Sequence, residues 1–298
     1  MRITIPSDGS ASCREAIRFI GERAKFMPEK PAVELITVEH PVPDDVIDRI
    51  DIKAIRAAYE ASAKKKLAQS VALAEAAGID TRTKVLAGVC GPEIAHAAEG
   101  FRADLIAMGS RGLSPAKSFF LGSVSRSVLE HTTLPVLLVR EKGLPERENL
   151  RIALAVDGSE YGPAAARFIV ENAELFGPAP SVGVISVTAD YAEIARNEVD
   201  FISPERSTAY LEGEAEGAWE KAVNPPAAIL AAAGIDVERV KREGDPAEQI
   251  ALYAESNADL IVMGSHGWGR LKSAVLGSTA TKVGALAHTP VLIVRAGE

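Results

Sequence analysis

The chain has 298 residues, of which 47% are hydrophobic and 25% charged, and its formal net charge is −8 at pH 7. This composition is typical of a globular protein of about two domains and excludes disordered and fibrous classes. The acidic balance argues against a nucleic-acid partner, because phosphate backbones bind basic surfaces. No apolar run approaches the ~20 residues that span a membrane, and Cys13 and Cys90 lack metal-ligand spacing. We therefore expect a cytoplasmic protein without a membrane partner or a protein-held metal.

Short apolar and β-branched runs alternate along the chain with longer amphipathic stretches, which is the pattern of βαβ units. Strands are predicted near residues 2–6, 32–38, 82–87, 104–108, 135–139, 151–156, 181–187, 236–241, 259–263 and 290–295. Helices are predicted between them. Continuous apolar runs such as residues 260–263 are typical of strands that are buried on both faces of a parallel sheet. The predicted fold class is α/β, with doubly wound parallel sheets.

One of the predicted helices contains two adjacent prolines, which disfavour a helix. Pro225 and Pro226 lie within the long helix expected in the second half, and they predict that this helix ends or kinks there. Residues 190–219 before them are predicted to form an irregular excursion followed by a helix, to which the sequence assigns no function.

The second half of the chain repeats the first. Residues 103–112, ADLIAMGSRG, return 155 positions later as residues 258–267, ADLIVMGSHG. Repetition within one chain indicates a duplicated structural unit. Residues 143–149 combine helix and strand breakers with charges. The sequence therefore predicts a first domain at 1–142, a linker at 143–149 and a second domain at 150–298.

A glycine spacing of the form Gly-x2-Gly-x9-Gly-Ser occurs once in each half. Its members are Gly109, Gly112, Gly122 and Ser123 in the first half, and Gly264, Gly267, Gly277 and Ser278 in the second. Glycines after a buried strand allow close approach and positive φ angles. A Gly-Ser pair before an amphipathic stretch offers backbone N–H groups at a helix start, where the helix dipole favours phosphate. The spacing predicts a phosphate-binding site in each half.

An aspartate follows the first strand of each half. Asp8 and Asp157 stand at the carboxyl edge of the predicted sheets, where open parallel sheets bind ligands. A carboxylate there can accept ribose hydroxyls or help to hold a metal ion. Because each aspartate precedes Gly-Ser, an Asx turn or a helix cap is the alternative interpretation.

Together these motifs resemble the nucleotide-binding branch of the universal stress protein family, and the resemblance covers nearly the whole chain. It implies five parallel strands in the order 3-2-1-4-5 in each half. It also implies that adenine lies near Val38 or Val187, that Asp8 and Asp157 approach the ribose or the base, and that the glycine-serine motifs hold phosphates.

The two halves differ next to these motifs. The first half has Arg111 and Ser125, which are expected to contact phosphate, where the second has His266 and Ala280. We therefore expect the first half to bind ATP more tightly.

Pairing of the two halves is also predicted. The apolar runs 136–139 and 291–294 are expected at sheet edges, and an unprotected apolar edge is an aggregation hazard that pairing removes. The fold prediction is therefore a pseudo-two-fold pair of domains. Self-association of the whole chain and unidentified protein partners stay open.

The leading hypothesis is a stress-response regulator that binds ATP, with Mg²⁺ as a companion ion, and hydrolyses it slowly if at all. The chain has no P-loop, no GxSxG elbow and no evident general base, so no catalytic residue is predicted. Two alternatives stay open: an ATP-consuming transferase or phosphatase on the same fold, and a scaffold that has lost its ligand.

Overall fold

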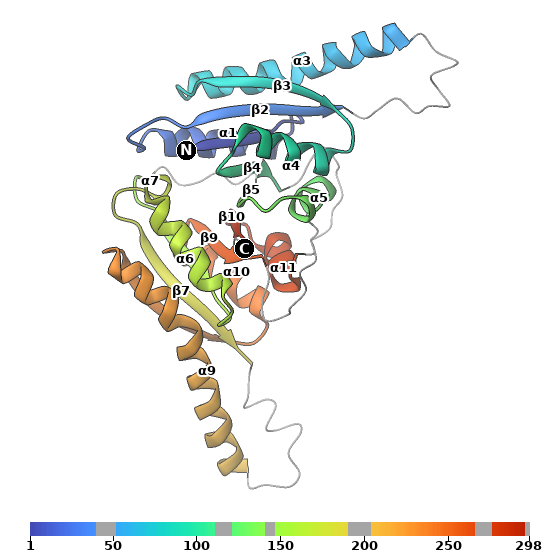
Figure 1. Ribbon diagram of the computed structural model, residues 1–298. Coiled ribbons are helices and arrows are strands. Elements are labelled where there is room, and N and C mark those ends of the chain that lie inside the picture. Colours follow the sequence, from blue (N-terminus) through green and yellow to red (C-terminus); the bar gives the residue numbers. More distant parts are fainter. Residues whose placement is uncertain (40–51, 111–120, 141–146, 190–203, 266–275, 296–298) are drawn as a thin grey trace. The chain divides into compact units, whose positions relative to one another are not determined.

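A computed structural model describes residues 1–39, 52–110, 121–140, 147–189, 204–265 and 276–295 (Figure 1). The chain divides into two compact units. Unit 1 contains Met1–Glu148, and unit 2 contains Asn149–Leu271 and Gly277–Glu298. Each unit is an α/β sandwich of helices around a parallel sheet, as the alternating sequence pattern predicts.

Unit 1 contains a sheet with the strand order β3-β2-β1-β4-β5, as expected. Its elements are β1 (Arg2–Pro6), α1 (Ala11–Ala24), β2 (Ala32–Glu39), α3 (Ile52–Ala76), β3 (Thr81–Ala87), α4 (Cys90–Phe101), β4 (Leu105–Gly109), α5 (Ser123–His131) and β5 (Val136–Val139). Helices α1 and α3 pack together on one face of the sheet, and α4 and α5 pack together on the other. The unit is therefore doubly wound.

Unit 2 repeats this order as β8-β7-β6-β9-β10. Its elements are β6 (Arg151–Ala155), α6 (Tyr161–Glu171), α7 (Ala173–Phe176), β7 (Ser181–Thr188), α9 (Pro204–Ala232), β8 (Asp236–Glu243), α10 (Pro246–Asn257), β9 (Leu260–Gly264), α11 (Ser278–Leu286) and β10 (Val291–Val294). Helices α6 and α9 cover one face, and α10 and α11 cover the other. The predicted pairing of the two units through β5 and β10 stays a prediction.

The central strands are buried on both faces. Leu105 and Ile106 of β4, and Leu260, Ile261 and Val262 of β9, have no exposed surface. Their uninterrupted apolar runs therefore identify them correctly as inner strands of a parallel sheet.

The sequence predicted that Pro225 and Pro226 end or kink the long helix of the second half. The prediction of a helix end is wrong, because α9 continues from Pro204 to Ala232 with both prolines inside it. Along the helix Val223, Pro226 and Leu230 are buried while Pro225 is exposed. This apolar face packs on β7, β8 and α6. Tertiary burial thus outweighs the roughly 3 kcal/mol that a proline costs inside a helix.

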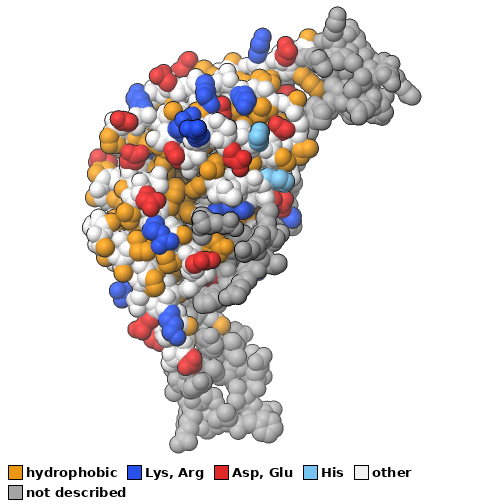
Figure 2. Space-filling view, viewed as in Figure 1, with side chains coloured by type: hydrophobic (Ala, Val, Ile, Leu, Met, Phe, Trp, Pro, Cys, Tyr) orange, Lys and Arg blue, Asp and Glu red, His pale blue; other side chains and the backbone are white. Residues whose placement is uncertain are grey.

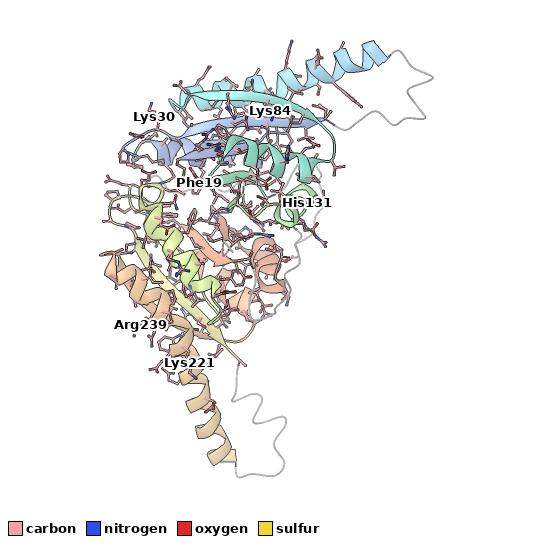
Figure 3. All side chains as sticks on the ribbon, viewed as in Figure 1. Phe19, Lys30, Lys84, His131, Lys221 and Arg239 are labelled. Atoms are coloured by element: carbon pink, nitrogen blue, oxygen red, sulfur yellow. The ribbon has the colours of Figure 1, made fainter. Side chains whose placement is uncertain are left out.

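The outer strands β3 and β8 carry charged side chains. Figure 3 labels Lys84 on β3 and Arg239 on β8, both of which are exposed. On the face shown in Figure 2, acidic and basic side chains are intermixed rather than gathered by sign. Charges on an edge strand disfavour pairing with a further strand.

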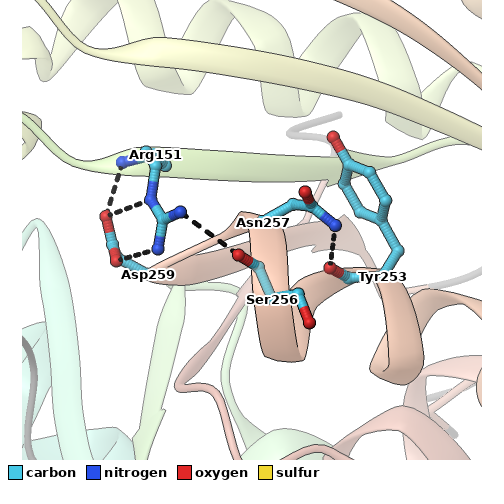
Figure 4. A network of polar contacts seen from close by, with 5 residues as sticks. All are labelled: Arg151, Tyr253, Ser256, Asn257 and Asp259. Atoms are coloured by element: carbon cyan, nitrogen blue, oxygen red, sulfur yellow. Dashed lines mark hydrogen bonds and ion pairs between the residues drawn. The ribbon is translucent and has the colours of Figure 1, made fainter.

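At the edge of the unit 2 sheet where the strands begin, the amino edge, Arg151 and Asp259 form an ion pair (Figure 4). Arg151 at the start of β6 donates from Nη2 to Asp259 Oδ1 at 3.0 Å and from Nη1 to the carbonyl oxygen of Ser256 at 3.2 Å. The hydrogen bond with Asp259 raises the pKa of Arg151. In unit 1 the corresponding Arg2 instead places its guanidinium over the ring of Phe101, 4.5 Å from the centroid. The amino edges are thus occupied by structural contacts.

One core position is filled differently in the two units. In unit 1, Glu34 of β2 is buried and pairs through Oε1 with Arg82 Nη2 at 3.0 Å, and Ala97 of α4 is also buried. In unit 2 the residue equivalent to Glu34 is Gly183. The hydroxyl oxygen of Tyr253 of α10, the residue equivalent to Ala97, lies only 2.4 Å from the position of an ideal Cβ on Gly183. A large side chain thus comes from the strand in one unit and from the helix in the other.

This exchange predicts that Gly183→Ala destabilises unit 2. The added Cβ overlaps the Tyr253 hydroxyl, and overpacking of a core costs about 1–3 kcal/mol. In the double variant Gly183→Ala, Tyr253→Phe the hydroxyl is absent and the next contact, to Cζ, lies at 3.2 Å. We expect the double variant to regain most of the lost stability in urea unfolding. Equal stability of Gly183→Ala and the unmodified chain would contradict this account.

The starts of α4 and α10 differ in their caps. Asp245 caps α10, and its Oδ1 accepts hydrogen bonds from the N–H groups of Ala247 and Glu248 at 2.9 and 3.1 Å. The bond from Glu248 lowers the pKa of Asp245. In unit 1 the equivalent residue is Val89, which is 65% exposed and caps nothing with its side chain.

We therefore expect Asp245→Ala to cost about 1 kcal/mol at pH 7 and Val89→Asp to add about as much. Because the folded-state pKa of Asp245 is depressed, its contribution is present above the unfolded value of about 3.9 and is lost as pH falls through the folded value. Urea unfolding at pH 7 and at pH 3 measures both effects. If Asp245→Ala lowered the free energy of unfolding equally at pH 7 and pH 3, the proposed contribution of the Asp245 charge would be rejected.

Candidate functional site

The aspartates after β1 and β6 both form Asx turns. The N–H of Ser10 donates to Asp8 Oδ1 at 2.9 Å, and the N–H of Ser159 donates to Asp157 Oδ1 at 3.0 Å. The glycine that follows each aspartate has a positive φ, 76° at Gly9 and 85° in the second unit, which glycine adopts without steric cost. Asp8 is half-buried and Asp157 is exposed. Both carboxylates stand at the carboxyl edge beside the switch point of their sheet.

The end of β4 and the start of α5 are joined in unit 1. The N–H of Gly122 donates to the carbonyl oxygen of Ser110 at 3.0 Å, and Ser125 Oγ donates to the carbonyl oxygen of Gly109 at 3.1 Å. Gly122 is the N-cap of α5 and Ser123 is its first residue. Since glycine has no side chain, the first-turn N–H groups of α5 face the strand end without a side-chain cap.

Unit 2 repeats this junction. The N–H of Gly277 donates to the carbonyl oxygen of Ser265, which follows Gly264, at 2.8 Å. Gly277 is the N-cap of α11, and Ser278 begins that helix. The residue equivalent to Ser125 is Ala280, which is buried. The two junctions therefore share the backbone bond that joins the strand end to the helix start but differ in their hydroxyls: unit 2 lacks that of Ser125 and instead has Thr281, whose Oγ1 donates to the carbonyl oxygen of Gly277 at 3.0 Å.

The backbone angles and the packing at these junctions show what the glycines and Ser125 do in the fold. Gly122 and Gly277 have φ angles of −56° and −57°, so these glycines are not required for a positive φ. Ser125 is 2% exposed, and its hydroxyl donates to the carbonyl oxygen of Gly109, which joins α5 to β4. Its expected contact with phosphate stays a prediction. Gly109 is needed because Ser12 of α1 packs against it: an added Cβ would lie 2.8 Å from the Ser12 carbonyl carbon.

The rest of the predicted phosphate loop lies outside the described residues. This applies to Arg111, Gly112 and Gly267. Their roles stay predictions. Val38 and Val187, which are expected beside adenine, are the half-buried next-to-last residues of β2 and β7.

Three residues that the motif analysis did not select also lie at the carboxyl edge of unit 1. Ser110 is 3% exposed, and its Oγ has no hydrogen-bond partner in the described part of the chain. Glu39, the last residue of β2, pairs through Oε1 with Lys66 Nζ at 2.8 Å. In the repeat, Glu39 corresponds to Thr188 of the second half. This difference between two otherwise similar halves is the sequence signal that could have drawn attention to Glu39 and its partner Lys66.

Both cysteines lie in this region of unit 1. Cys13 Sγ donates to the carbonyl oxygen of Pro6 at 3.5 Å, and burial raises the pKa of its thiol. Burial also raises the pKa of the Cys90 thiol, which interacts electrostatically with Glu39 and Lys66. These shifts keep both thiols protonated at neutral pH.

Among the described residues, no group of three His, Cys, Asp or Glu side chains is arranged to hold a metal ion. No helix in the described ranges is both long and apolar enough to cross a membrane.

The two units are doubly wound, and in each a helix with a glycine N-cap begins at the switch point of the sheet. The chain is therefore a tandem α/β protein with a candidate ligand-binding site at the carboxyl edge of each sheet. The sequence model of the Universal stress protein family matches residues 1–140 and again residues 148–295. The chain belongs to the universal stress protein family.

Relatives support the tandem organisation. A crystal structure of a universal stress protein from Archaeoglobus fulgidus DSM 4304 superposes with a TM-score of 0.69 at 25% identity, covering 99% of this chain and 98% of that one. A universal stress protein of Mycolicibacterium smegmatis is 26% identical over 194 residues, 65% of this chain and 62% of the relative. The match thus spans less than two thirds of that relative. A universal stress protein of Thermus aquaticus is 35% identical over 140 residues, 46% of this chain and 97% of its own length.

Proposed function

We propose that the protein binds ATP, accompanied by Mg²⁺, at the carboxyl edge of each sheet and acts in the cytoplasm as a nucleotide-dependent regulator of the stress response. Family membership supports the stress-response role. The sequence contains no evident general base to activate a water molecule, so we expect ATP hydrolysis to be slow at most. Hydrogen bonds to the phosphates alone would stabilise the transition state of hydrolysis only to a limited extent.

The buried hydroxyl of Ser110 is the observation that carries this proposal. Its Oγ is without a partner in the described residues, and a buried unsatisfied hydroxyl costs about 1–3 kcal/mol. The same residue accepts, through its carbonyl oxygen, the N–H of Gly122 at the start of α5. A phosphate oxygen at this helix start would accept hydrogen bonds from the uncapped N–H groups and from a neighbouring hydroxyl. The chemistry of these donors therefore fits an anionic ligand.

The size of the edge fits a nucleotide. Strand β1 lies between β4 and β2, so a ligand that starts at α5 and ends beside β2 crosses two strand spacings, about 10 Å. Asp8 stands at the middle strand, where a ribose would lie. In unit 2, β6 lies in the same way between β9 and β7, with Asp157 at its end.

Native mass spectrometry of the purified full chain tests the proposal. We expect a mass increase that corresponds to up to two molecules of ATP per chain. Retained or added ATP rejects the scaffold alternative, and a chain that binds no ATP at millimolar concentration rejects our proposal. Turnover above about one per second, which is within the usual enzyme range, would instead favour an ATP-consuming enzyme.

A further inference from the structure

The carboxyl edge of unit 1 contains a fixed ion pair. Lys66 Nζ of α3 lies 2.8 Å from Glu39 Oε1 at the end of β2, and the two side chains are 29% and 13% exposed. They are thus largely covered yet still reachable from solvent. The stem of Lys66 lies beside the turn after β1, because an ideal Cβ on Gly9 would be 3.8 Å from Lys66 Cγ. The pair therefore lies next to the turn that contains Asp8.

Neighbouring contacts hold this pair in place. One turn further along α3, Ser70 Oγ and Ser7 Oγ form a buried hydrogen bond of 2.7 Å. The carbonyl oxygen of Glu39 accepts the N–H of Gly88 at 3.0 Å. Strand β2 and helix α3 are therefore both fastened at the edge, which fixes the carboxylate and the ammonium group relative to the sheet.

Unit 2 lacks this pair. Matching backbone bonds align the two units: Gly244 donates to Thr188 as Gly88 donates to Glu39. By the same alignment, Ala222 corresponds to Lys66 and is 4% exposed. The positions of Ser7 and Ser70 are taken by Val156 and Pro226, both of which are buried. The same edge is thus polar and charged in unit 1 and mainly apolar in unit 2.

We propose that Glu39 and Lys66 recognise the base of the nucleotide in unit 1, an inference that rests on the proposed function. A carboxylate acceptor beside an ammonium donor is complementary to a base edge with an amino donor beside a ring-nitrogen acceptor. Adenine offers this arrangement at its amino group and the adjacent ring nitrogens. A site built for such bonds discriminates against an analogue that lacks the amino group. Unit 2, with Thr188 and Ala222, binds the base without this selection.

The test compares ATP with purine riboside 5′-triphosphate, which lacks the amino group and adds no bulk. Calorimetry on the full chain carrying Gly277→Val reports unit 1, and the chain carrying Gly122→Val reports unit 2. We expect unit 1 to bind the analogue at least about tenfold more weakly than ATP, the effect of one lost hydrogen bond to a charged group. Unit 2 should show a ratio below about threefold.

The double variant Glu39→Met, Lys66→Met, made in the Gly277→Val chain, removes both charges while keeping unbranched side chains of similar length, so neither charge is left unpaired. We expect the unit 1 ratio to fall below about threefold, whereas Lys65→Met, an exposed neighbour on α3, leaves it unchanged. Circular dichroism verifies that each variant is folded. A ratio that survives the double variant, or an equal ratio in unit 2, overturns this inference alone. Failure of the unmodified chain to bind ATP overturns the proposed function, and this inference with it.

Discussion

Replacement of both Gly122 and Gly277 by valine is expected to remove all ATP binding while the chain stays folded. Their φ angles of −56° and −57° are accessible to valine, so the backbone tolerates the change. The new side chain, however, stands at the N-cap, beside the N–H groups that would bind phosphate. Valine is also a poorer N-cap than glycine, by about 1 kcal/mol, so only a modest fall in stability accompanies the loss of binding.

Calorimetry on the single variants separates the two sites. Each single variant should lose one ATP per chain, and the double variant should bind none. Gly100→Ala, at an open position on α4 with no heavy atom near the added Cβ, is the matched control and should keep full stoichiometry. Unchanged stoichiometry in a folded double variant would remove the basis of the phosphate-site assignment.

Gly109→Ala is expected to destabilise unit 1 strongly. The added Cβ would lie 2.5 Å from Ser12 Oγ and 2.8 Å from both the Ser12 carbonyl carbon and its Cβ. Since a backbone atom is among these contacts, relief requires α1 to shift from β4. We expect a loss at the upper end of the 1–3 kcal/mol that overpacking costs, or about 3 kcal/mol.

Urea unfolding compares this variant with Gly100→Ala, which should gain roughly 0.5–1 kcal/mol because alanine favours a helix over glycine. Adding Ser12→Ala to Gly109→Ala removes the hydroxyl contact and leaves the backbone contact. It should therefore restore stability in part. Full restoration would show that the hydroxyl alone, and not the approach of the helix backbone, requires glycine at this position.

Most of the fold could be predicted from the sequence. The strand positions follow from short apolar runs such as residues 260–263, because inner parallel strands are buried on both faces. The order within each sheet was implied by the family resemblance, and the structure confirms it. The prediction for α9 was wrong because it was based on the low helix propensity of Pro225 and Pro226. Local propensity does not include the stabilisation that comes from burying Val223 and Leu230 against the sheet.

The site was less accessible to such reasoning. The glycine spacing indicated the β4–α5 junction, but the φ angle of Gly122 and the bond from Ser125 to Gly109 depend on how α5 packs against β4. Glu39 and Lys66 are 27 residues apart in sequence, and no local pattern joins them. Their pairing follows from the register of β2 and the packing of α3, which arise from the tertiary structure.

The exchange of Glu34 and Ala97 for Gly183 and Tyr253 has a consequence for how a duplicated chain assembles correctly. Similar tandem domains can misfold when an element of one copy docks on the sheet of the other. If α10 docked on the first sheet, Tyr253 would meet Glu34 and overfill the core. If α4 docked on the second sheet, Ala97 would face Gly183 and leave a cavity, which destabilises a core. We therefore expect the divergence at this one position to disfavour both wrong assemblies.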